Sequence, residues 1–172
     1  MAELMMPLRN VFQWVSELPT SIAIRESLFF SPYLTVAHVI SMCLFAGLIV
    51  MMDLRLLGIG NMSTPFSEVQ KRLFPWQMLG MAMSAVTGLT LAYSDPMRFY
   101  VNIFFWTKML VMVLAGINAM AFHFITYNSV LTWDSRATTP FGAKLSGALG
   151  MVLWAIVIVS GRLIPYNWFQ NN

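Results

Sequence analysis

The side chains of this chain best suited to hold a cofactor are two histidines, and each lies inside a long apolar stretch. His38 lies within the run 28–52, and His123 lies within the run 109–133. Ionisable side chains inside such runs are costly to bury and usually functional. A neutral imidazole has one hydrogen-bond donor and one acceptor, and its unprotonated nitrogen binds haem iron, zinc or copper. We therefore predict cofactor or metal binding at His38 and His123, with hydrogen bonding to a neighbouring helix as the structural alternative.

Methionine is the other ligand type that the sequence offers. Fifteen methionines are present, and thioethers suit Cu(I), although most stand where any flexible apolar side chain could pack. Met42 follows His38 by four residues and Met120 precedes His123 by three, so each shares a helical face with a histidine. These two pairs make copper the alternative to haem.

The composition predicts the elements that must position these side chains. The chain is 58% hydrophobic and only 10% charged, with a mean hydropathy of +0.69, whereas soluble domains carry about 25% charged residues. A span of the hydrocarbon core needs about 20 apolar residues. We expect an all-α integral membrane four-helix bundle over residues 28–166, with spans at about 28–52, 73–94, 103–130 and 143–165, followed by a short tail, 167–172.

Residues 1–27 have a different pattern, because apolar side chains recur there at three- and four-residue spacing. The opposite face carries polar and charged residues, which is typical of an amphipathic helix lying at a membrane surface. We expect an interfacial helix and linker in this segment, and no cleavable signal peptide. The apolar positions are Leu8, Val11, Phe12, Val15 and Leu18.

Helix geometry bears on whether both histidines could bind one haem. The first and third spans run in the same direction, so depth can be counted from the loop that follows each span. The two histidines then differ by four to ten residues, or about 6 to 15 Å at 1.5 Å per residue. The lower value allows one haem with two axial imidazoles, and the upper value requires two separate sites.

The basic residues bear on orientation in the membrane. Lys108 and Arg162 lie at or inside span ends, where they can snorkel or pair internally, so they are set apart from the count. Five basic residues then lie in the first and third loops against three on the other side, which favours cytoplasmic loops and periplasmic termini. Arg162 also has a specific candidate role, since it could meet an anionic group such as a haem propionate. The five loop residues are Arg55, Lys71, Arg72, Arg136 and Lys144.

Several function classes lack a signal in the sequence. There is no nucleophile with an adjacent base, no metal-hydrolase motif and no phosphate loop, so we do not expect an enzyme on its own. No basic stripe or known motif indicates nucleic acid. The single cysteine, Cys43, excludes an intrachain disulfide.

Short segments spread over nearly the whole chain resemble an uncharacterised bacterial inner-membrane family, domain of unknown function 6644. This resemblance implies a four-span protein of the bacterial cytoplasmic membrane and supplies no activity. The segments that carry it are Ile24-Arg25-Glu26-Ser27, His38 with Gly47, Asp53-Leu54-Arg55-Leu56-Leu57-Gly58, Phe74-Pro75-Trp76, Lys108-Met109-Leu110, Asn118 to His123, and Gly161-Arg162-Leu163-Ile164-Pro165-Tyr166.

These observations favour a small redox module in the membrane. Its b-type haem would bind to His38 and His123, and electrons would pass between a quinone or a periplasmic donor and a partner protein. Copper or other metal handling by the same histidines with Met42 or Met120 is the first alternative. A cofactor-free scaffold subunit is the second, and a homo-oligomer is compatible with each.

Overall fold

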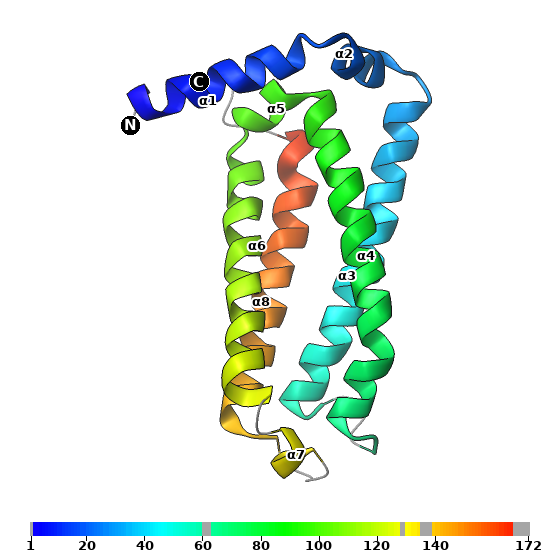
Figure 1. Cartoon of the computed structure of the whole chain (residues 1–172), viewed down its shortest axis with the longest axis vertical. Helices are drawn as coiled ribbons and strands as arrows, with labels where there is room; N and C mark the ends of the chain where they lie inside the picture. Colours follow the sequence, from blue (N-terminus) through cyan, green and yellow to red (C-terminus); the bar gives the residue numbers. More distant parts are fainter. Residues whose placement is uncertain (1, 60–62, 128–129, 135–138, 167–172) are drawn as a thin grey trace.

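The computed structural model describes residues 2–59, 63–127, 130–134 and 139–166, and within these ranges the chain is helical apart from short connections (Figure 1). The prediction of an all-α protein is confirmed for these residues. The α-helices are α1 (Ala2–Ser16), α2 (Pro19–Glu26), α3 (Phe30–Leu57), α4 (Phe66–Ser94), α5 (Pro96–Tyr100), α6 (Ile103–Ala121), α7 (Val130–Trp133) and α8 (Phe141–Leu163).

Four long helices, α3, α4, α6 and α8, run roughly side by side. Close packing joins them in the order α4, α3, α8, α6, since α3 packs on α4 and α8, and α8 packs on α3 and α6. The helices at the two ends of this order, α4 and α6, do not pack on each other to a similar extent. The expected closed four-helix bundle is therefore not confirmed, because one of its four seams lacks close packing.

Among the residues that the structure describes, three segments are long and apolar enough to cross a membrane, namely Phe30–Leu57, Ile103–Thr126 and Phe141–Tyr166. The fourth expected span, 73–94, lies in α4, which does not reach the same apolarity. Polar side chains on this helix, among them Gln77, Ser84 and Thr87, account for the difference. However, α4 has 29 residues against 28 in α3 and runs antiparallel beside it (Figure 1). It therefore extends through the same layer as α3.

The helix ends have local causes. Gly58 ends α3 in the left-handed region at φ 81°, which glycine adopts without strain. Asn102 starts α6, since its side-chain oxygen accepts hydrogen bonds from the backbone N–H groups of Phe104 at 3.0 Å and Phe105 at 3.2 Å. The third span was expected to continue as a helix to residue 130. Instead, α6 ends at Ala121 and a π-helical turn follows over Phe122–Thr126.

The N-terminal helices lie across one end of the long helices, where α3 and α6 begin and α8 ends (Figure 1). We call this the terminal end, and the end near Gly58 and α7 the opposite end. The expected N-terminal helix is present as α1. The rings of Phe12 in α1 and Tyr100 in α5 are in contact, with their centroids 5.3 Å apart. Ser21 in α2 is fully buried and donates to the carbonyl of Tyr93 at the end of α4, at 2.8 Å.

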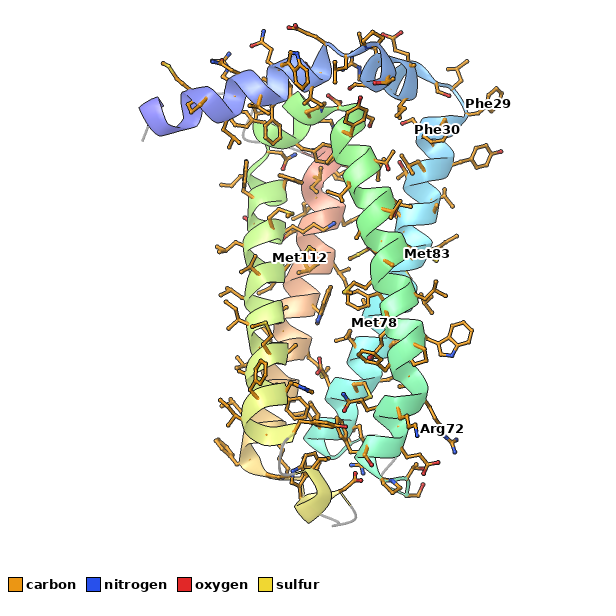
Figure 2. The ribbon with its side chains drawn as sticks, in the orientation of Figure 1. Phe29, Phe30, Arg72, Met78, Met83 and Met112 are labelled. Atoms are coloured by element: carbon orange, nitrogen blue, oxygen red, sulfur yellow. The ribbon has the colours of Figure 1, made fainter. Side chains whose placement is uncertain are left out.

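Apolar side chains are distributed unevenly between the interior and the outer surface. A buried cluster lies at the opposite end, where Phe66 is 1% exposed and contacts the rings of Phe122 and Trp133. Along the helices, many apolar side chains instead point outward (Figure 2). Only 11% of the most apolar stretch of α3 is buried within the protein. This surface needs an apolar solvent, and lipid provides one.

Candidate functional site

His38 lies on α3 and faces α4. Its Nδ1 atom is 2.9 Å from the hydroxyl oxygen of Thr87. A methyl group on Gly88 would lie 2.8 Å from Cε1 of the same ring, so α4 can approach only because residue 88 has no side chain. The half-buried imidazole is thus held between a hydroxyl and a glycine of one neighbouring helix.

The hydrogen bonds of Thr87 indicate which nitrogen of His38 carries the proton. The Thr87 hydroxyl has a single hydrogen, and that hydrogen is directed to the carbonyl of Met83 at 2.7 Å within α4. The hydroxyl oxygen is then an acceptor toward His38, so Nδ1 of His38 donates. In a neutral imidazole the second nitrogen, Nε2, keeps its lone pair. This arrangement favours the tautomer in which Nε2 can bind a metal.

Lys108 on α6 adds a charge to the same region. Its ammonium group lies within electrostatic range of His38. A methyl group on Gly161 of α8 would lie 3.7 Å from Lys108 Nζ. Across the described part of the chain, Lys108 makes no hydrogen bond or ion pair. His38, Thr87 and Lys108, which we call the His38 cluster, thus bring a polar group from each of α3, α4 and α6 together near the terminal end.

His123 has a different environment. It lies in the π-helical turn after α6, its side chain is exposed, and its ring stacks on Tyr127 with the centroids 5.3 Å apart. His38 comes eight residues after the start of α3, whereas His123 comes 20 residues after the start of α6. Both helices start at the terminal end (Figure 1), so the two residues differ in depth by about 18 Å. The structure does not bring the two histidines together, and one haem could not bridge them.

The other predicted site residues are also separated from one another. Met120 is 59% exposed and lies on the outer surface, so it does not face the interior beside His123. Met42 is half-buried on α3, one turn after His38. Arg162 is exposed near the end of α8, with its guanidinium 5.6 Å from the centre of the Tyr166 ring. Arg162 is therefore at the same end as the His38 cluster, and Met120 is not part of that cluster.

One buried polar group is not among the residues predicted to form a site. Asp53 near the end of α3 is 8% exposed, and its Oδ2 atom has no hydrogen-bond partner among the described residues. Its carboxyl group lies against α8, where a methyl group on Gly150 would be 2.9 Å from Asp53 Cγ. An acidic residue at a span end is typically an interfacial anchor. The glycine at position 150 was the available signal that the two helices approach more closely here.

The described residues thus form a multi-pass α-helical protein whose apolar helices are long enough for a membrane and whose interior holds isolated polar groups. Residues 22–167 match a family of unknown function, DUF6644, and the chain belongs to this family. The resemblance noted in the sequence is thereby confirmed. No curated protein and no solved structure matches the chain.

Proposed function

We propose that this protein is a small redox module of the bacterial cytoplasmic membrane that binds a b-type haem through His38. The observation that carries the proposal is the hydrogen bond between His38 Nδ1 and Thr87. Histidines that bind metals commonly donate their other ring N–H to a neighbouring group, which fixes the ring and its tautomer. His38 has this arrangement, and the exposed His123 does not.

The charges near His38 favour haem over copper. Lys108 carries a positive charge within electrostatic range of the imidazole, which would repel a copper ion bound there. Haem b carries two propionate groups, and these are partners for cationic side chains. Lys108 and Arg162 both lie near the terminal end, on the surface side of His38, where propionates pointing toward the headgroups would meet them.

A bound haem would supply one-electron transfer between its ferric and ferrous forms. The chain itself would hold the iron through His38, keep Nδ1 protonated through Thr87, and exclude water by its apolar surroundings. A membrane quinone or a periplasmic protein would be the electron donor or acceptor. In this proposal both termini face the periplasm, since the excess of basic residues lies at the opposite end, in the helix ends and connections there.

The test compares the two histidines directly. Protein purified from haem-replete cells should show a reducible b-type Soret and alpha band. We expect His38→Ala to abolish this spectrum and His123→Ala, the matched control, to leave it intact. Loss of the spectrum in both variants, or only in His123→Ala, would contradict the assignment to His38.

The same preparation distinguishes the other functions. Stoichiometric copper without haem, lost in His38→Ala, would replace the proposal with metal handling. A preparation with neither haem nor metal would leave a scaffold subunit, alone or as a homo-oligomer, in which His38 only joins α3 to α4.

A further inference from the structure

Asp53 differs from His38 because, among the residues that the structure describes, no partner neutralises or hydrogen-bonds its carboxyl group. The side chain is 8% exposed and lies within a membrane-length apolar helix. In the described part of the chain, it forms no hydrogen bond or ion pair through its carboxyl group, and Oδ2 is buried with no partner at all. An ionised carboxylate left alone in such a place is strongly unfavourable, whereas a neutral carboxyl costs far less.

The backbone of α8 lies directly against Asp53. Its carboxyl group lies over Gly150, and its carbonyl oxygen would be 2.8 Å from a methyl group on Gly147. Both glycines belong to α8, so α8 approaches α3 closely where the acid is buried. A hydrated cation, which needs several oxygen ligands, does not fit against this backbone.

The charged residues of the surrounding helices do not neutralise Asp53. Arg55 on α3 donates to the carbonyl of Thr64 at 3.0 Å, and Arg72 pairs with Glu68 on α4. Lys71 on α4 and Lys144 on α8 are exposed. Gln77, a buried polar residue on α4, donates to the carbonyl of Leu48 at 3.4 Å. Within the described ranges, none of these groups is bonded to Asp53.

From this geometry we infer that Asp53 is a proton-binding site inside the membrane, with the proton held on the carboxyl group while α3 and α8 are packed together. The proton would come from the aqueous phase at the opposite end, since Asp53 is four residues before the last residue of α3. Its release would leave a carboxylate that is stable only if water reaches it, so release requires the Gly147 and Gly150 contact to open. Protonation and helix packing are thereby coupled.

The experiment is infrared spectroscopy of the full-length protein in liposomes at neutral pH. We expect a carbonyl stretch of a protonated carboxyl group, shifted in protein labelled with 13C at the aspartate side-chain carboxyl. Only three aspartates are present, so the label reports on few groups. Asp53→Asn should remove the band, and Asp95→Asn should leave it.

Three outcomes would overturn the inference. The first is the absence of a protonated aspartate band from the wild-type protein, which needs no variant to interpret. The second is a band that persists in Asp53→Asn. The third is loss of the band when sodium chloride is added at constant pH, which would identify Asp53 as a cation site.

Discussion

The regions around His38 and His123 contain the same residue type in similarly apolar helices, yet their surroundings differ in every respect that bears on chemistry. His38 faces a neighbouring helix, is hydrogen-bonded to Thr87 and has a lysine ammonium nearby. His123 is exposed at a π-helical turn and stacks on a tyrosine of its own segment. A histidine in an apolar run thus becomes a candidate ligand only when another helix fixes its ring.

The two methionines near the histidines differ from each other in the same way. Met42 shares the half-buried face of His38, whereas Met120 shares the exposed surface of His123. Spacing of three or four residues predicts that two side chains lie on one helical face. It does not predict whether that face meets protein or lipid.

The largest expected effect comes from filling the space beside His38. Gly88→Leu should displace the imidazole, because even a methyl group at this position would lie 2.8 Å from the ring. Overpacking of this kind costs about 1 to 3 kcal/mol. The measurement is the thermal unfolding midpoint in detergent.

Gly116→Leu on α6 is the matched control, since a methyl group there meets nothing within 4 Å. It changes the same residue type in another long helix and should leave the midpoint nearly unchanged. Equal losses of stability in the two variants would contradict the claim that position 88 is packed against His38 whereas position 116 on α6 is open.

A much smaller effect on stability is expected from a substitution of His123. His123→Phe keeps an aromatic ring that can stack on Tyr127 and places it on an exposed surface. The free energy of unfolding should change by no more than about 0.5 kcal/mol, as for surface substitutions in general. If this variant unfolds as readily as Gly88→Leu in the same detergent, His123 is not at the surface.

Much of the fold could be predicted from the sequence because membrane-length apolar runs leave few alternatives. The all-helical class, the N-terminal helix and the positions of the long helices follow from the pattern. The small residues of α4 mark its contact with α3, since Ser84 is buried and Gly80 and Gly88 both face α3. The closed bundle did not follow, because the pattern within each helix says little about which pairs of helices pack closely.

The candidate site was less predictable, since it depends on contacts between residues far apart in the chain. His38 was found from its type and position, but its partner Thr87 is 49 residues away. The range of depth offsets left open whether one haem could join the histidines, and the actual offset depends on where α3 and α6 begin. The type and position of Asp53 give no signal that it is buried, because a charge near a span end is usually an interfacial anchor and only the α3–α8 packing buries this one.

Nitrogen NMR of protein labelled with 15N-histidine tests the central claim most directly, because the chain has only two histidines and gives two sets of imidazole signals. Before any cofactor is added, one ring should be a fixed tautomer with the proton on Nδ1 and a free lone pair on Nε2. Thr87→Val should shift the signals of that ring and leave those of the other unchanged. Signals that are unaffected by Thr87→Val, or a responding ring with its proton on Nε2, would contradict the claim that Thr87 prepares His38 as a ligand.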